Sequence, residues 1–326
     1  MFKISNLNPK AKSEINTGFG VNSSDYAGRF LNKDGDPNIG KKGVSIFERI
    51  SWYHTMLKLP AWNFFAVIFL FFIGSNLVFA SIYFLIGADH LHGMVYDSDN
   101  GKFAEAFFFS CQTFTTVGYG RINPVGFLAS AIASFEALIG LLSFALATGL
   151  FYGRFSKPKA YLRFSKNALL SPFQGNTAIM FRVAPFKNTT LVDAEAKVTL
   201  AISLEEDGKK VNKFFQLPLE YSTVNALTLS WTIVHPINES SPLYNLTQED
   251  FANLRGEIIV YLKAFDDMFS NIVVARTSYI FKEVIVGAKF KPMFEGSETG
   301  NKTILYLDRL NSYTTAEIKF VDNVTI

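Results

Sequence analysis

PAWNFFAVIFLFFIGSNLVFASIYFLIG, residues 60–87, is the stretch that decides the class of this fold. It holds no charged residue, and none occurs anywhere between Lys58 and Asp89. A helix needs about 20 apolar residues to cross the hydrocarbon core of a bilayer, and this stretch is longer. A cleavable signal peptide would be shorter and would begin near residue 1, whereas a long polar segment precedes this stretch. The sequence therefore predicts a transmembrane helix.

A second apolar stretch covers residues 127–151, and Glu136 is its only ionisable residue. Two spans return the chain to the side of the membrane on which it begins. Lys and Arg concentrate at the cytoplasmic ends of membrane spans. They are frequent before the first span and after the second, whereas acidic residues outnumber them in the connecting loop. We therefore expect a multi-pass protein of the cell membrane with both termini in the cytoplasm.

The composition agrees with membrane insertion and limits the remaining chemistry. Hydrophobic residues make up 49% of the 326 residues, and 34 residues are phenylalanine. The length leaves room for a small membrane part and one soluble domain. A single cysteine excludes an internal disulfide framework and a cysteine-built zinc site, and a net charge of +3 does not favour nucleic acid. We recognise no phosphate-binding loop, nucleophile and base pair or carboxylate cluster that would indicate an enzyme.

The loop between the spans contains an apolar segment that is too short to cross the membrane. FAEAFFFSCQTFTT, residues 103–116, is followed by VGYG, and Asn123 and Pro124 then interrupt the chain before the second span. A short helix that enters and leaves the membrane on one side is a re-entrant element. Its irregular end is tolerated only where protein or water covers the backbone.

The residues TFTTVGYG, 113–120, closely resemble the selectivity-filter signature of potassium channels. Glycine at 118 and 120 permits backbone angles closed to other residues, so that successive carbonyl groups can point toward one axis. The resemblance implies that filters of this kind assemble from four chains, so we expect a homotetramer. Potassium ions in the filter are then the only bound ions expected, with no other cofactor. The ion-binding residues implied are Thr115, Thr116, Val117, Gly118, Tyr119 and Gly120, with K⁺ held chiefly at 116–119.

The family is indicated by residues outside the filter. RFSKPKA (154–160), FRVAPFKNTTLVDAEAKVTL (181–200) and LSWTIVHPINESSPLY (229–244) look like the prokaryotic inward rectifier potassium channel (KirBac) family. The resemblance extends from about residue 45 to about residue 294. The amphipathic stretch SIFERISWYHTMLKLPAW, which begins at Ser45, resembles the slide helix of these channels and suits the membrane surface. An ordinary amphipathic cap before the first span is the alternative.

The region after the second span has the pattern of strands. Alternate residues are apolar over 192–204 and 227–233, and further runs at 256–265 and 271–286 are divided by turn residues. The fold class expected is thus a two-span helical pore domain plus a cytoplasmic immunoglobulin-like β-sandwich. The domain bounds predicted are an N-terminal segment (1–44), slide helix (45–59), pore domain (60–156), sandwich (165–295) and C-terminal tail (296–326).

The resemblance makes the second span the inner helix that lines the pore. In this family the short helix before the filter, here within residues 103–116, is called the pore helix. Glu136 is implied to hold this helix from behind the filter, although attraction of ions is the alternative. Gln112 stands where animal relatives have a glutamate that forms a salt bridge behind the filter, so another arrangement must brace this filter. Gly140 matches a glycine at which the helix can bend, or it simply allows close packing.

Phe144, Thr148 and Tyr152 share one face of the same helix because they are four residues apart. The family places its cavity lining and its narrowest constriction on that face, with Tyr152 as the gate. Packing against lipid or another helix is the alternative. Phe144 also stands where strong rectifiers have an acid, so pore block by cytoplasmic cations should be weak unless acids of the soluble domain, such as Glu205, Glu206 or Asp207, line the vestibule.

Basic residues flank the spans on the cytoplasmic side and are candidates for binding anionic phospholipids. The positive-inside bias explains the same residues equally well. The function expected is passive, potassium-selective transport through an inward-rectifier-type channel. A channel gated by a soluble ligand and a membrane-anchored scaffold with a degenerate pore are the alternatives. The candidate lipid-facing cations are Arg49, Lys58, Arg154, Lys157, Lys159 and Arg163.

Overall fold

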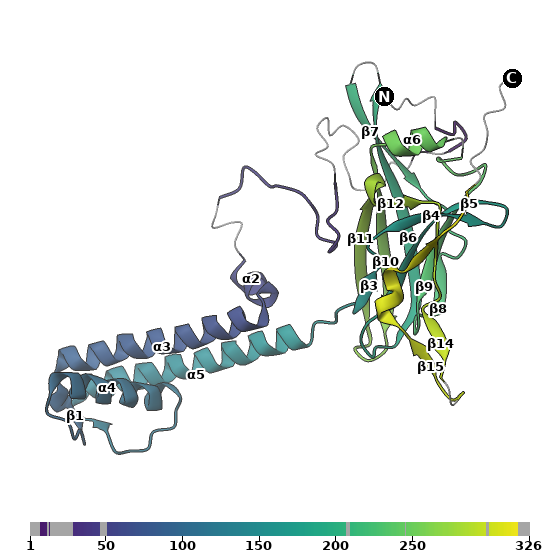
Figure 1. The fold of residues 1–326 in the computed structure, drawn as a ribbon. Coiled ribbons are helices and arrows are strands. Elements are labelled where there is room, and N and C mark those ends of the chain that lie inside the picture. The colour runs from purple at the N-terminus through teal and green to yellow at the C-terminus, as the bar shows by residue number, and fades with distance from the viewer. Residues whose placement is uncertain are drawn as a thin grey trace. The chain divides into compact units, whose positions relative to one another are not determined.

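The computed structural model describes residues 7–11, 13, 29–45, 51–206, 209–244, 246–297 and 300–318. The chain divides into two compact units. Residues 42–157 form one, and residues 1–41 together with 158–326 form the other. The first is called the helical unit here, and the second, which is built mainly of strands, the strand unit (Figure 1).

Four α-helices make up most of the helical unit as far as it is described: α2 (Trp52–Lys58), α3 (Ala61–Ile86), α4 (Asp99–Phe114) and α5 (Phe127–Phe155). α3 and α5 are long and apolar enough to cross a membrane, which confirms the two predicted spans. α4 is the short helix predicted between them. It begins at Asp99 rather than at residue 103 because the Ser98 hydroxyl accepts a hydrogen bond from Gly101 N at 3.3 Å and caps the helix.

The amphipathic stretch predicted at 45–59 is described only in its second half. α2 begins after Ser51, whose hydroxyl accepts a hydrogen bond from His54 N at 3.4 Å. α2 packs on the last turn of α5, where a Cβ at Gly153 would lie 2.6 Å from Tyr53 Oη. Glycine at 153 therefore permits this close approach. Outside the described residues lie Ile46, Phe47, Arg49 and Ile50.

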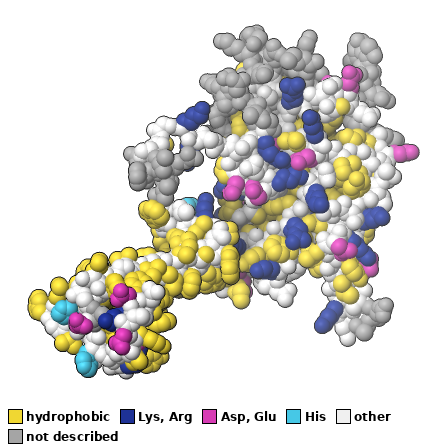
Figure 2. All heavy atoms as spheres, turned by 60° about the vertical axis from the view of Figure 1, so that its left-hand side comes forward, with side chains coloured by type: hydrophobic (Ala, Val, Ile, Leu, Met, Phe, Trp, Pro, Cys, Tyr) yellow, Lys and Arg dark blue, Asp and Glu magenta, His cyan; other side chains and the backbone are white. Residues whose placement is uncertain are grey.

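A small core forms where α3, α4 and α5 meet. Its aromatic centre is the pair Tyr83 and Phe109, whose rings lie 5.2 Å apart. Most other apolar side chains of α3 and α5 stay on the outside, while charged and histidine side chains gather at the end that carries β1 (Figure 2). So much exposed apolar surface requires lipid or further chains around it. The core residues are Phe79, Ala80, Tyr83, Leu91, Ala106, Phe109, Ile122 and Ala133.

The strand unit contains a sandwich of two five-stranded sheets, which confirms the predicted β-sandwich. One sheet has the order β11-β10-β6-β7, and β8 also pairs with β6. The other has the order β12-β4-β5-β3, and β9 also pairs with β5. Only β12 and β4 are parallel. The bounds are β3 (Leu162–Phe164), β4 (Ala168–Phe173), β5 (Asn176–Pro185), β6 (Leu191–Glu206), β7 (Lys209–Gln216), β8 (Thr223–Ala226), β9 (Trp231–Ile237), β10 (Gly256–Asp266), β11 (Asn271–Ile280) and β12 (Val284–Val286).

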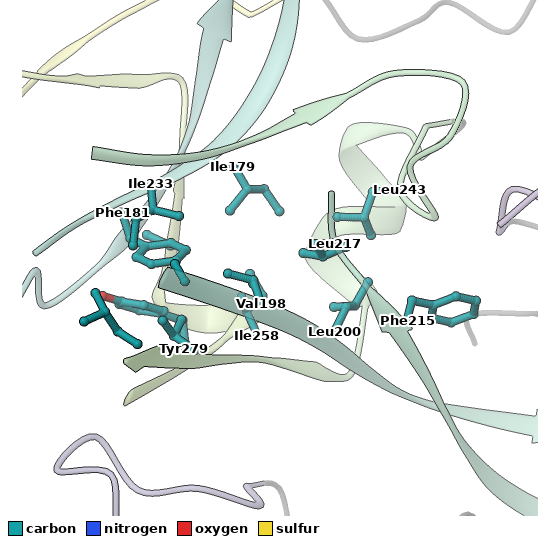
Figure 3. Close-up of a cluster of buried hydrophobic side chains, with 14 of the residues drawn as sticks. Ile179, Phe181, Val198, Leu200, Phe215, Leu217, Ile233, Leu243, Ile258 and Tyr279 are labelled. Carbon is teal, nitrogen blue, oxygen red and sulfur yellow. The ribbon is translucent and has the colours of Figure 1, made fainter. Parts of the chain in front are cut away.

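The core of the sandwich lies between the two sheets (Figure 3). Val198 and Leu200 of β6 belong to it, as the alternating pattern predicted, and Phe181 of β5 faces them from the other sheet. One predicted strand is wrong in extent. Leu227 N donates to Leu191 O at 2.8 Å and so prolongs the pairing of β8 with β6. The chain then bends, and β9 begins only at Trp231.

The folded part of this unit continues past residue 295, where the sequence pattern placed the start of a tail. Met293 and Leu310 are buried against Ala184 on the second sheet. Burial of these apolar side chains stabilises the packing of the C-terminal residues on the sheet. The elements involved are β13 (Ala288–Phe290), β14 (Phe294–Gly296), β15 (Thr303–Leu305), η4 (Leu307–Asn311) and β16 (Tyr313–Thr315).

The N-terminal residues 29–38 also belong to the strand unit, packed on the first sheet. The buried carboxylate of Glu257 accepts hydrogen bonds from Phe30 N and from Leu31 N, at 2.5 and 3.0 Å. Arg29 forms an ion pair with Glu283 at 2.8 Å. The segment that leads toward α2 is therefore fastened to the sandwich.

Candidate functional site

The loop that follows α4 has the backbone of an ion-coordinating turn. Thr116, Gly118 and Gly120 have φ angles of +59°, +50° and +83°, so every second residue is left-handed. Val117 N and Gly118 N both donate to Gln112 O, at 2.9 and 3.3 Å. A left-handed threonine is strained, and such strain is usually kept where function requires it. Alternation of this kind turns successive carbonyl groups toward the same side of the loop.

None of the described residues covers this loop, because residues 115–120 are all exposed. Tyr119 is 80% exposed. Within a membrane, backbone groups without a partner are costly, so this loop would need other copies, water or ions around it.

Behind the loop, the carboxylate of Glu136 is fully buried. It accepts a hydrogen bond from Tyr83 Oη of α3 at 2.6 Å, and Ser110 Oγ of α4 donates to its other oxygen. Ser110 Oγ also lies 2.9 Å from Asn76 Oδ1. This polar cluster therefore joins α3, α4 and α5.

Gly140 lies where α5 passes closest to the end of α4. A Cβ there would lie 2.8 Å from the carbonyl carbon of Phe114 and closer still to its oxygen. One turn further on, Phe144 begins the exposed face predicted to line the cavity. Phe144 is 75% and Tyr152 is 74% exposed, and Thr148, which also lies on that face, donates from its hydroxyl to Phe144 O at 2.9 Å.

The end of the filter loop at Gly120, called its outer end here, is held by an ion pair that the sequence analysis missed. Glu105 Oε1 of α4 accepts a hydrogen bond from Arg121 Nη1 at 2.7 Å, and Arg121 directly follows Gly120. β1 (Leu91–His92) and β2 (Asn123–Pro124) pair beside it. The available signals were an acid within an apolar helix and a base at the end of the filter motif, but spacing alone does not join residues across a loop.

The predicted lipid-facing cations differ in their surroundings. Arg154 Nη1 donates to Leu59 O at 2.7 Å, and its guanidinium lies 4.9 Å from the ring centre of Phe64. Arg163 lies over Phe186 within the strand unit. The exposed residues are Lys58, Lys157, Lys159 and Arg163, while Arg49 is outside the described residues. Within the described ranges, no group of three or more His, Cys, Asp or Glu side chains is placed to hold a metal ion.

Two sequence families match the chain. An ion channel family matches residues 59–157, and the inward rectifier potassium channel C-terminal domain matches residues 162–321. The inward rectifier potassium channel Kirbac3.1 of Paramagnetospirillum magnetotacticum is 33% identical over 281 residues, which cover 85% of this chain and 92% of that protein.

Animal proteins match less closely. The G protein-activated inward rectifier potassium channel 2 of Mus musculus is 28% identical over 81% of this chain and 67% of its own length. The inward rectifier potassium channel irk-1 of Caenorhabditis elegans is 29% identical over 58% of this chain and 37% of its own. Two membrane-competent helices, a filter-like loop and a β-sandwich therefore agree with these matches, and the chain belongs to the inward rectifier potassium channel family, whose members are ion channels and not enzymes.

Proposed function

We propose that four copies of this chain form a pore that conducts K⁺ passively and selectively across the cell membrane. The observation that carries the proposal is the left-handed backbone at every second residue of an exposed loop with the sequence TTVGYG. Carbonyl groups of Thr116, Val117, Gly118 and Tyr119, with the Thr116 hydroxyl, would replace the hydration shell of the ion. Thr115 and Gly120 bound this segment. Assembly would cover the exposed ring of Tyr119 with a neighbouring copy.

The inner helix supplies the gate in this proposal. The exposed aromatic rings of Phe144 and Tyr152 lie on one face of α5, and fourfold symmetry would bring each set together on the axis. An apolar constriction of that kind stops hydrated ions by dewetting. Glu136 and Gln112 support the filter from behind, and Gly140 fits α5 against the pore helix rather than only allowing it to bend.

Anionic phospholipid is the proposed regulator, acting at the cytoplasmic ends of the spans. Exposed Lys58, Lys157 and Lys159 are free to reach headgroups, and Arg163 is a further candidate. Arg154 is different, because its bond to Leu59 O joins α5 to the junction of α2 and α3. It therefore supports the slide helix from the protein side. This arrangement requires both termini in the cytoplasm, where the basic residues cluster.

The test is ion flux in liposomes that contain the purified full-length protein. Barium-sensitive uptake of radioactive rubidium is expected, with no comparable uptake of sodium, and it should change when anionic lipid is added. Gly118→Ala should abolish it, since residue 118 has a φ of +50° but no atom within 4 Å of an added Cβ.

Gly74→Ala in α3 is the matched control, because its site is equally open but has an ordinary φ. Intact tetramers without flux would instead support the scaffold with a degenerate pore. Equal passage of sodium and rubidium would overturn the filter assignment.

A further inference from the structure

The outer end of the filter loop is fixed by a different kind of contact from its inner end. At the inner end, two backbone N–H groups donate to Gln112 O. At the outer end, Gly120 has a φ of +83° and no atom within 4 Å of an added Cβ, so its surroundings in the chain leave it free to turn. Arg121 is the next residue, and its side chain is the one that ties this end to α4.

Glu105 joins three segments of the helical unit through one buried carboxylate. Its side chain is 3% exposed. One oxygen accepts from Val95 N and Tyr96 N, at 2.8 and 3.3 Å, and the other accepts from Arg121 Nη1 at 2.7 Å. All three donors approach a carboxylate that belongs to α4. A buried carboxylate with these partners has a fixed direction, so it is suited to act as an anchor.

Arg121 is held from a second side as well. Its Nη1 also donates to Gly93 O at 3.2 Å. Gly93 has a φ of +95°, and a Cβ there would lie 3.0 Å from the carbonyl carbon of Arg121. The adjacent Ile122 is buried in the core of the unit. The chain after Gly120 is therefore held by an ion pair, a glycine contact and an apolar anchor within two residues.

We propose that Glu105 and Arg121 form an ion-pair clamp that holds the outer end of the filter in its conducting conformation. Both are positioning residues, because their hydrogen bonds are to each other and to the backbone of residues 93–96. The inference rests on the proposed potassium-channel function. Gln112 cannot form the salt bridge that a glutamate forms at this position in animal relatives. The clamp would brace the filter in its place.

The orientation of the donors makes the clamp directional. Two of the three groups around Glu105 are backbone N–H donors. They need an acceptor at position 105, and an arginine there would offer them only further donors. Reversal of the pair by Glu105→Arg with Arg121→Glu should therefore fail to restore function. Arg121→Lys keeps a cation with several N–H donors at the site, so it should retain most of the function.

The experiment measures rubidium uptake by full-length protein in liposomes at a series of external K⁺ concentrations. A filter that has lost its outer brace should collapse when few ions occupy it. Arg121→Gln and Glu105→Gln are therefore expected to raise the K⁺ concentration that sustains half-maximal uptake by about tenfold, and to admit more sodium. Arg121→Lys should stay near the original value.

Lys102→Gln is the matched control, since Lys102 lies one turn from Glu105 on α4 and makes no ion pair among the described residues. It should behave as the original protein does. If Arg121→Gln lowers only the melting temperature of the tetramer and leaves the K⁺ dependence and the sodium uptake unchanged, the clamp is merely structural and the inference is wrong. If the unaltered protein takes up no rubidium, the proposed function has failed instead.

Discussion

Replacing Gly140 by alanine should displace the end of the pore helix. The added Cβ would lie 2.8 Å from the carbonyl carbon of Phe114, whereas ordinary contact begins at 3.4 Å, so the two helices must separate by at least 0.6 Å. Both partners are backbone, which cannot swing aside as a flexible side chain can. Overpacking of this kind costs about 1–3 kcal/mol. Phe114 is the last residue of α4, so the displacement enters the filter directly.

The assay is tetramer unfolding in detergent together with rubidium and sodium uptake in liposomes. Gly140→Ala should lower the unfolding temperature and raise sodium uptake relative to rubidium. Gly149→Ala on the same helix is the control, because nothing lies within 4 Å of its added Cβ. If Gly140→Ala keeps the original stability and selectivity but changes only how often the channel opens, residue 140 acts as a bend in the helix and the packing argument is refuted.

Three further predictions concern other parts of the chain. Tyr152→Ala should increase rubidium leak through closed channels, whereas Leu146→Ala, equally exposed but on another face, should not; equal leak would remove Tyr152 from the gate. Burial lowers the pKa of His235 to about 4, from an ordinary 6.5. Between pH 6.5 and pH 4 the unfolded chain binds a proton that the buried imidazole does not, so sandwich stability should fall by about 3 kcal/mol as the pH falls through this range. His235→Gln should flatten that part of the pH dependence of thermal unfolding, and identical curves would contradict it. Gly35→Ala should speed tryptic cleavage in residues 29–38, because its Cβ would lie 2.7 Å from the β11 backbone. Gly43→Ala, with a similar φ but open surroundings, should change the rate far less.

The two spans were predictable, and the loop proposed as the filter could be located, because both signals are local. A long run of uncharged apolar residues indicates a membrane helix without reference to any other part of the chain. The TTVGYG loop depends only on the backbone angles that its own residues can adopt. The sandwich was predictable as a class, since alternation along β6 and β10 depends on one face of each strand. The strand predicted at 227–233 is wrong in extent. Alternation shows that a segment is extended but does not show which strand its backbone pairs with, and Leu227 bonds to Leu191.

The parts that escaped prediction depend on contacts between distant residues. Glu105 and Arg121 are separated by the whole filter motif, and only the turn of the loop brings them within 2.7 Å. Leu310 is buried against Ala184, which lies far earlier in the chain. The sequence around residue 310 contains no pattern that predicts this contact. Arg154 looks like a membrane-facing cation in sequence, yet its bond to Leu59 O is a contact within the protein.

Two of the close contacts that hold α5 to its own unit flank the proposed gate residue Tyr152 along the helix. Gly140 fits against Phe114 at the filter end. At the other end, Gly153 fits against Tyr53 of α2, and the side chain of Arg154 bonds to Leu59 O. Residue 153 is the neighbour of Tyr152, so α2 and the gate ring share one packed contact. Close-packed contacts transmit displacement because they leave no void to absorb it. We therefore expect a shift of α2 to repack the helix turn that carries Tyr152.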